Sequence, residues 1–353
     1  MALTEFGVNH ALANKLYSKK LALEILKETD IADLISEGSD SVGQILTETQ
    51  KAAGDQITWG LEMQLSGTGI QGDGILEGNE EELTYYDDAV LINQLRHAVR
   101  SKGKMSEQRV PYPVRERAKN RLRDWWTDRF GVSIFNQLCG YTVQSDTRFT
   151  GNNTVTAPDS THHIWGGDAT SDATIDAADT ISLRDIDRLV EKAKTITPTV
   201  RPIMMNGRKK YVLFIHPYQE FNLRQSAASA GSWFDIQKAA LQGGDKTGNP
   251  LYRDALGEYR DVILRVDTRV TQGVSATTTA ISTVRRAVFC GAQSFCIAFG
   301  QDGGANKFSW VEELFDYKNS LGVACGTIVG IKRAIFNSMS FGSIVLSTYA
   351  TSH

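Results

Sequence analysis

A chain of 353 residues is long enough for one elaborate domain or two ordinary ones, with a sizeable buried core. Its formal net charge of −3, from 38 basic and 41 acidic residues, argues against a general nucleic-acid coat, which needs an excess of Lys and Arg to neutralise phosphates. No stretch approaches the roughly 20 apolar residues of a membrane helix, and the N-terminus has no apolar signal core. We therefore expect a soluble cytoplasmic protein without a membrane partner.

Four cysteines form no C-x-x-C pair, which suits a reducing compartment without a disulfide framework. We interpret them as small buried apolar residues: Cys139, Cys290, Cys296 and Cys325.

Residues 1–54 predict an arm of short helices and polar loops that lies outside the core. Four leucines recur near helical spacing, and Asp30 can cap a second short helix that ends before Gly38. The leucines are Leu12, Leu16, Leu23 and Leu26.

A long hairpin is predicted next. Apolar residues alternate from Ile57 to Leu65, which indicates a strand with one apolar face, and a second extended segment covers 83–99. The stretch between them, GTGIQGDGILEGNEEEL at 67–83, is rich in glycine and acidic residues. We expect it to form the flexible, acidic tip of the hairpin.

A long amphipathic helix is predicted over 114–138, where apolar residues recur every three or four positions and Gly140 follows as a C-cap glycine. Of the adjacent Trp125 and Trp126 in this helix, we expect one in the core and one at an interface.

The remaining chain predicts loops over 145–180, a helix capped by Ser182, a hairpin about Asn206-Gly207 and a helix that begins at Pro217. The last third reads as short strands and turns. The predicted class is α+β with mixed antiparallel sheets.

Two glycine motifs suggest phosphate binding, and we reject both. Residues 67–72 match G-x-G-x-x-G, but no helix pattern follows to receive a pyrophosphate, and acidic residues crowd the place where phosphates would sit. In GGDKTG at 243–248, Asp245 occupies a position where a phosphate-binding loop needs glycine. A flexible hairpin tip and a surface turn are the simpler interpretations.

Metal and catalytic chemistry find little support. His162 and His163, with Asp159 and Asp168 nearby, could ligate a metal, but adjacent loop histidines lack the spacing of a known site, and a solvated or interface loop is favoured. No GxSxG, HExxH or triad-like spacing stands out. The run Glu80-Glu81-Glu82 is more typical of a solvated face than of an acid/base pair. We therefore predict no enzyme, no cofactor and no metal.

The charges are unevenly placed. Residues 52–95 contain nine acidic residues and no Lys or Arg, whereas 96–123 contain ten basic and two acidic residues. An acidic hairpin cannot pack on its own copy, but it can lie across the basic block of a neighbouring copy, in a head-to-tail contact that closes into rings or larger assemblies. Nucleic-acid binding by the basic helix and an ordinary solvated helix are the alternatives.

Several segments, in the same order, resemble the major capsid proteins of tailed bacteriophages, specifically the branch named after the coliphage N-four. The segments are LEGNEEEL, INQLRHAVRSKGKMSEQRV, RAKNRLRDWW and, more loosely, PDSTHHIWGG, YVLFIHPYQEFNLR, RRAVFCGAQSF and GIKRAIFNSMSFG. The resemblance covers most of the chain from about residue 50 onward.

The resemblance implies the Hong Kong 97-like capsid fold. Its parts would be an N-terminal arm, an extended hairpin called the E-loop, a P-domain with a long spine helix, an A-domain and returning P-domain strands. The expected boundaries are, in that order, 1–54, 55–104, 105–145, 146–300 and 301–353.

The implied function is a major capsid protein that forms pentamers and hexamers in an icosahedral shell around double-stranded phage DNA, assembled in the bacterial host cytoplasm. The DNA contact would be non-specific, and portal, scaffolding or decoration proteins are implied partners. An encapsulin-like compartment and, remotely, a nucleotide-binding enzyme are the alternatives. We expect intersubunit contacts through acidic and basic side chains: Glu77, Glu80, Glu81, Glu82, Arg109, Arg115, Arg117 and Arg121.

Some capsids of this fold join neighbours by a lysine–asparagine isopeptide bond from the E-loop. Residues 52–95 contain no Lys, and Lys102 and Lys104 lie only at the base of the hairpin. The sequence therefore predicts a shell without such cross-links.

Overall fold

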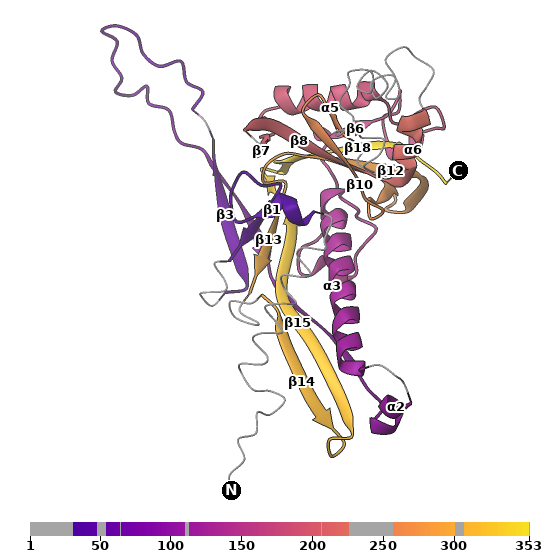
Figure 1. The fold of residues 1–353 in the computed structure, drawn as a ribbon. Coiled ribbons are helices and arrows are strands. Elements are labelled where there is room, and N and C mark those ends of the chain that lie inside the picture. The colour runs from indigo at the N-terminus through magenta and orange to yellow at the C-terminus, as the bar shows by residue number, and fades with distance from the viewer. Residues whose placement is uncertain are drawn as a thin grey trace.

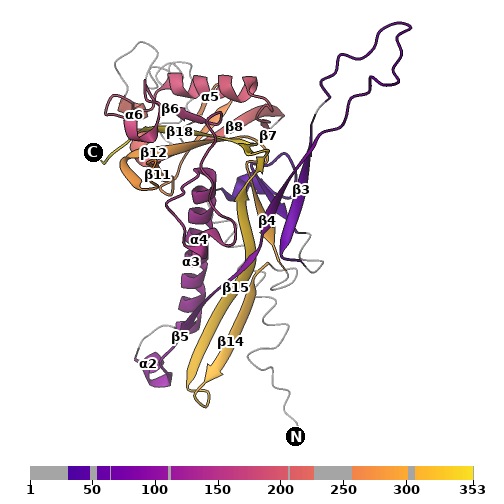
Figure 2. The ribbon, with the colours of Figure 1, turned by 180° about the vertical axis from the view of Figure 1, so that it is seen from behind.

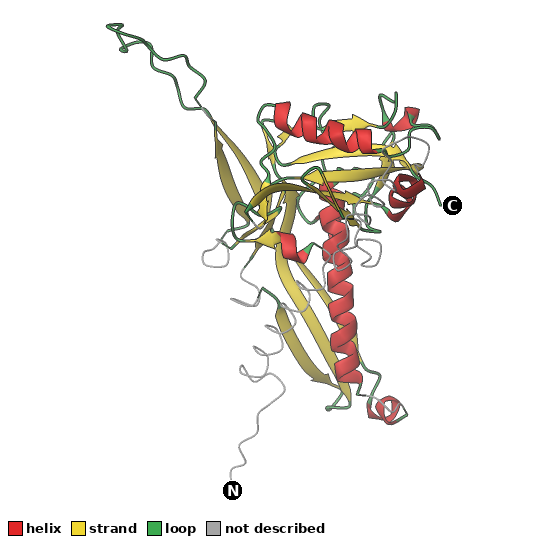
Figure 3. Ribbon diagram, turned by 45° about the horizontal axis from the view of Figure 1, so that its top comes forward, coloured by secondary structure: helices red, strands yellow, loops and turns green. Residues whose placement is uncertain are grey.

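The computed structural model describes residues 31–47, 54–63, 65–109, 113–205, 207–225, 257–300 and 307–352. Figures 1 and 2 show an elongated half, built on the long helix α3 (Val114–Leu138), and a compact half at the C-terminal end of that helix. A hairpin projects from the region where the halves meet. Figure 3 shows helices and sheets mixed in both halves, so the predicted α+β class is confirmed.

The elongated half contains a six-stranded sheet that lies along α3. Its central strand is β15 (Ser320–Arg333), which pairs antiparallel with three other strands along its length. These are β5 (Asn93–Arg100), β13 (Phe295–Phe299) and β14 (Ser309–Phe315), and the sheet continues through β2 (Gly43–Leu46) to β1 (Ile35–Ser36).

The compact half contains an eight-stranded sheet packed against α5 (Leu183–Thr195). Its main order is β6 (His163–Trp165), β18 (Ser343–Tyr349), β12 (Ala280–Cys290), β8 (Arg208–Ile215), β10 (Val262–Val266) and β9 (Glu258–Tyr259). Two short strands join this sheet: β11 (Gln272–Val274) on β12 and β7 (Ile203–Met205) on β8.

Several short elements lie outside these two sheets. They are η1 (Ala32–Leu34), α2 (Lys104–Gln108), α4 (Thr147–Thr150), η3 (Asp172–Thr174), α6 (Pro217–Gln225) and the pair β16 (Ile335–Phe336) and β17 (Met339–Ser340). No helix among the described residues is both long and apolar enough to cross a membrane.

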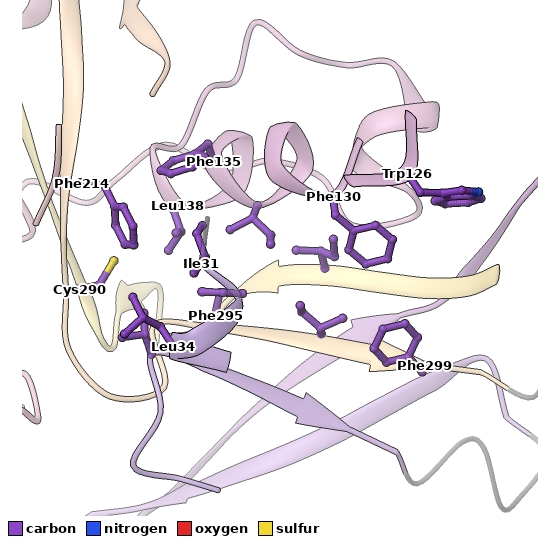
Figure 4. Packing of buried hydrophobic residues seen from close by; sticks show 14 of the residues in the cluster. Ile31, Leu34, Trp126, Phe130, Phe135, Leu138, Phe214, Cys290, Phe295 and Phe299 are labelled. Atoms are coloured by element: carbon purple, nitrogen blue, oxygen red, sulfur yellow. The ribbon is translucent and has the colours of Figure 1, made fainter. Parts of the chain in front are cut away.

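The apolar face of α3 forms the main core with the six-stranded sheet. Trp126, Phe130 and Phe135 are buried on this face, and the ring of Phe130 stacks on Phe299 with centroids 6.3 Å apart (Figure 4). Side chains three or four residues apart lie on the same face of a helix. The recurrence of apolar residues at this spacing therefore located α3 correctly from the sequence. Trp126 is fully buried and Trp125 half-buried, so the expected core role of one tryptophan is confirmed.

Local signals were also confirmed at the element ends. Gly140 has φ +61°, and the Tyr141 and Gly140 amides donate to the Asn136 and Gln137 carbonyls, which terminates α3 in a Schellman motif. The Asp185 carboxylate accepts from the Ser182 amide at 3.0 Å, as in a capping box. Met205 pairs with Arg208 across the predicted hairpin, and α6 begins at Pro217.

The first described segment differs from the expected arm. Ile31, Leu34 and Val42 are buried in the main core, and β2 lies between β1 and β13. The segment therefore completes the sheet, because its apolar side chains cover sheet surface that would otherwise be exposed to water. Asp30 and the four leucines before it lie outside the described residues.

The C-terminal segment also divides differently from expectation. Strands β14 and β15 belong to the elongated half, but β18 lies in the eight-stranded sheet beside β12. Conversely, β13 falls within the range 146–300 expected for the A-domain, but it belongs to the sheet of the elongated half. Nearly every residue of β18 is buried, which is typical of a central strand covered on both faces.

Candidate assembly interface

The hairpin is built by β3 (Gln56–Glu62) and β4 (Tyr85–Leu91), which pair antiparallel over their full length. The predicted alternation is observed, since Ile57 is buried and the neighbouring Gln56 and Thr58 are exposed. Residues beyond Glu62 on the first limb do not continue the strand. Residues 65–84 form the long loop of the tip, and Figure 1 shows it projecting away from both halves.

The base of the hairpin is fixed to the body. Lys332 forms an ion pair with the buried Asp88 and also donates to the Ala89 carbonyl at 2.9 Å. The other carboxylate oxygen of Asp88 accepts from the Ile335 amide at 3.2 Å. These bonds join β4 to the end of β15, so the body sets the direction in which the hairpin projects.

The tip combines glycines with one set of hydrogen bonds between its two limbs, made by Glu81 and called the Glu81 stitch below. Gly69, Gly72 and Gly78 have positive φ, and a Cβ placed on any of them would meet no atom within 4 Å. Glu81 accepts from the Ser66 and Gly67 amides at 2.6 Å each, and these bonds lower the pKa of its carboxyl. We infer that the tip can bend about its glycines while Glu81 holds the limbs together.

The G-x-G-x-x-G match lies in this tip. Strand β3 precedes it, but residues 67–84 contain no helix before β4 begins. The helix N-terminus that a dinucleotide fingerprint requires is therefore not formed, as predicted. GGDKTG lies outside the described residues.

Exposed apolar side chains accompany the acidic ones in the tip. Ile75 is 72% exposed and Leu76 61%, next to the exposed Glu77. Further large apolar side chains are exposed along the limbs: Leu65, Ile70, Leu83 and Tyr85. Sequence reasoning treated the tip as only acidic and glycine-rich. The signal was present in ILE at 75–77, which places two aliphatic residues in an otherwise polar loop.

The predicted basic partners lie directly after α2 (Arg109) and on α3, and Arg109, Arg117 and Arg121 are exposed. Arg115 differs from the others, because its guanidinium forms a 2.8 Å ion pair with the buried Glu312 of β14. This bond anchors the start of α3 to the sheet, so Arg115 contributes to the fold in its own chain.

The acidic tip and the basic helix are not brought together within one chain. Figures 1 and 2 show the tip on the opposite side of the body from α3. Glu80 accepts from the Gly78 amide at 2.8 Å, and Glu81 is bonded within the tip. A contact between the two charged regions therefore requires two copies.

The adjacent histidines are buried rather than solvated. The Nδ1 of His162 lies 2.8 Å from Asp159, whose other oxygen accepts from the Ser340 amide. These hydrogen bonds hold the carboxylate and lower the pKa of Asp159 despite its partial burial. No cluster of three or more His, Cys, Asp or Glu side chains in the described ranges could hold a metal. The pair connects the 159–163 loop to the C-terminal strands.

His163 contributes to a buried polar group that only superficially looks catalytic. Its Nε2 lies 2.8 Å from the Ser347 hydroxyl and 3.4 Å from Asp172. In a catalytic triad, Ser and Asp contact different ring nitrogens, whereas here both approach the same one. Ser347 is also completely buried, so no substrate could reach its oxygen.

Acid is expected to destabilise the fold through His163 and His216. Burial lowers the pKa of each to about 4, below the usual value of about 6.5 that applies to the unfolded chain. The unfolded state therefore binds protons first, so their contribution is fully present above pH about 6.5 and is lost as pH falls towards 4. Urea midpoints followed by tryptophan fluorescence should fall over this interval, and less so in His163→Asn. An unchanged midpoint from pH 7 to 4 would contradict this.

All four cysteines are free and buried, as predicted, and burial raises the pKa of the Cys290 and Cys139 thiols. Raised thiol pKa values leave little thiolate at neutral pH. These residues therefore pack as small apolar side chains.

Comparison with known proteins gives the arrangement its context. The family model for phage capsid protein matches residues 5–352. The major capsid protein of Pseudomonas phage KPP25 is 29% identical over 333 residues, covering 85% of this chain and 84% of that protein. The capsid of Ralstonia phage GP4 is 32% identical, covers 99% of both chains and superposes with a TM-score of 0.79.

A more distant structure shares the fold. The cyanophage Pam1 capsid is 21% identical, with 93% of this chain and 94% of that chain covered and a TM-score of 0.73. The chain therefore belongs to the phage capsid protein family, and it is a phage major capsid protein with the Hong Kong 97-like fold.

Proposed function

We propose that copies of this chain form pentamers and hexamers, and that the hairpin tip of each copy lies on α3 of its neighbour. The observation that carries the proposal is the tip itself. It projects from the body with exposed acidic and aliphatic side chains, while an exposed basic helix lies on the other side of the same chain. In this arrangement the hairpin is the E-loop, α3 the spine helix, the elongated half the P-domain and the compact half the A-domain.

The contact gains its strength from apolar burial and its direction from charge. An exposed ion pair contributes only about 0 to 1 kcal/mol. Burying an exposed Ile or Leu side chain contributes roughly 1.5–3 kcal/mol, so Ile75 and Leu76 outweigh any one glutamate. Charge pairs repeated over many copies still fix the register, and added salt should weaken the contact.

The shell encloses double-stranded DNA in this proposal, held through its backbone without sequence preference, because one protein that lines a genome cannot read bases. It assembles in the host cytoplasm with a portal and with scaffolding or decoration proteins as further partners. Its role is structural, without catalysis. The N-four-like branch stays a prediction.

Electron microscopy of negatively stained protein, combined with light scattering, tests self-assembly. The chain expressed alone should give uniform closed shells. Nuclease-protected DNA of genome length in shells from infected cells separates a capsid from an encapsulin-like compartment. A lasting monodisperse monomer that binds stoichiometric nucleotide would instead support the enzyme alternative.

Shells are expected to be held without covalent cross-links. The hairpin proper has no lysine to donate an amine, and Lys102 and Lys104 lie beyond its base on the far side of β5. Purified shells, boiled and reduced, should therefore run as one band at the mass of the monomer. A ladder of covalent multimers would contradict this prediction.

A further inference from the structure

A small cavity lies between α3, α4 and the strands β5 and β15. Its volume is about 50 Å³. Apolar side chains that include Leu95, Phe130 and Ile331 form part of its wall, and Thr147 and Arg148 of α4 lie along another part. Thr147 and Arg148 are exposed, so this wall reaches the protein surface.

Two of the residues that line this cavity each carry a buried hydrogen-bond donor without an acceptor. Within the part of the chain that the structure describes, neither Trp126 Nε1 nor Arg129 Nη1 has a hydrogen-bond partner, although both atoms are buried. Trp126 is completely buried, and Figure 4 shows its indole nitrogen on the side away from Phe130. A buried donor without an acceptor destabilises the fold, and more so if it is charged.

Arg129 is held by aromatic rings in place of an acidic partner. Its guanidinium lies 3.7 Å from the Phe149 ring centroid and 4.9 Å from that of Trp125. Burial lowers its pKa, with nearby Asp128 and Asp146 opposing the shift. Trp125 is positioned in turn by stacking on His97 at 4.4 Å. The cation is therefore oriented in advance, and the group that it lacks is an anionic acceptor.

A carboxylate on a short apolar stem fits this site. It accepts two hydrogen bonds at once, from an indole N–H and a guanidinium N–H, and it neutralises the cation. A cavity of about 50 Å³ is too small for a drug-sized molecule but holds a carboxylate or a few waters. The residues beside the carboxylate must then cover the apolar rim.

We propose that this cavity receives Glu77 from the hairpin tip of a neighbouring copy, with Leu76 and Ile75 covering its rim. The inference rests on the proposed docking of the tip on α3 and specifies its end point. Glu77 is exposed and follows the two most exposed aliphatic residues of the tip. No hydrogen bond or ion pair holds its side chain in the described structure.

The spacing of charges on both copies agrees with this placement. From Glu77 to Glu80 or Glu82, a fully extended chain spans at most about 10–16 Å, and a turn in which the Asn79 amide donates to the Leu76 carbonyl shortens this reach. From Arg129 back to Arg121, eight residues of helix span about 12 Å. With Glu77 in the cavity and this turn opened at Gly78, the run of glutamates reaches the exposed Arg121, which pairs with Asp124 in its own chain at 3.3 Å. The docked tip would run along α3 in register with its cations.

Disulfide trapping in assembled shells tests the placement. One variant combines Ile75→Cys at the rim with Thr147→Cys at the exposed wall of the cavity, and Glu77 is kept. The matched control combines Ile75→Cys with Arg117→Cys, which lies about three helical turns before Arg129 on α3. The native cysteines are buried, so they contribute little background. Shells are assembled under reducing conditions, oxidised and run on a non-reducing gel.

A ladder of multimers from the Thr147 pair and not from the Arg117 pair is expected. A ladder from the Arg117 pair alone would overturn the cavity assignment while the docking on α3 stands. No ladder from either pair, in shells that form normally, would overturn both.

A second measurement separates carboxylate binding from mere proximity. Glu77 is unchanged in the Thr147 pair, so Arg129→Gln should slow the oxidative cross-link about tenfold or more, because a charge-assisted hydrogen bond to Glu77 is lost. Trp126→Phe, which keeps an aromatic ring in the core, should slow it less. Unchanged rates in both variants would mean that waters alone occupy the cavity, and the assignment would fail.

Discussion

Replacing Glu80, Glu81 and Glu82 together by Lys is expected to block or misdirect shell assembly while leaving the monomer folded. The substitution makes the tip cationic, so it would meet the basic α3 of a neighbour with like charge, which costs free energy at every contact of the shell. All three side chains are exposed, and none packs in a core. Light scattering and negative-stain microscopy measure assembly, and circular dichroism checks the fold. Normal shells from the triple variant would contradict hairpin docking.

The structure supplies a matched control for this variant. Glu81 bonds the Ser66 and Gly67 amides, so its replacement also loosens the tip, whereas Glu80 and Glu82 can be changed with that stitch intact. A Glu80→Lys/Glu82→Lys double variant should therefore still impair assembly if charge is responsible. Glu81→Gln alone isolates the effect of the stitch. Assembly lost only when Glu81 changes would assign the effect to tip geometry instead of charge.

Arg286→Met is expected to destabilise the folded chain by roughly 3–5 kcal/mol, the usual cost of removing one partner of a buried ion pair. Arg286 is 5% exposed and donates to Asp172 at 2.8 Å. Its Nη1 donates to the Cys139 and Gly140 carbonyls, which follow the end of α3. The substitution leaves the buried Asp172 carboxylate without its cationic partner, and it removes the donor to the Cys139 and Gly140 carbonyls. Urea unfolding of the monomer measures the loss.

Two controls accompany Arg286→Met. Arg148→Met removes an exposed arginine that pairs with Asp146, and it should cost less than about 1 kcal/mol. Adding Asp172→Leu to Arg286→Met removes the stranded charge and should recover part of the lost stability. A loss below about 1 kcal/mol for Arg286→Met would mean that this pair does not hold α3 to the compact half.

Much of the fold could be predicted because its signals are local. The α3 stripe, the Gly140 stop, the Ser182 cap and the hairpin strands each depend on residues within a few positions of one another. Periodicity and capping report such short-range geometry directly. The charge contrast between the tip and α3 was equally legible, because it is a property of composition.

The unpredicted features depend on residues far apart in sequence. Arg115 meets Glu312, and Arg286 meets Asp172, only after the sheets have formed. The same holds for His162 and His163, which resembled a polar loop until the C-terminal strands covered them. The pairing of β2 with β13 likewise places residues of the expected N-terminal arm in the core. Long-range pairing leaves no periodic trace in either segment, so single-sequence patterns could not locate it.

The cavity beside Arg129 illustrates this limit at the candidate site. Its walls come from β5, α3, α4 and β15, and none of these segments alone suggests a binding site. The aliphatic residues of the tip were visible in the sequence, but only their exposure shows that they lack a partner within the chain.

High-resolution cryo-electron microscopy of the assembled shell would show where the hairpin tip docks. Each tip is expected to lie on α3 of a neighbouring copy, with Glu80 and Glu82 near its basic residues. A tip that folds back on its own chain, or that projects into solvent without touching a neighbour, would contradict this expectation.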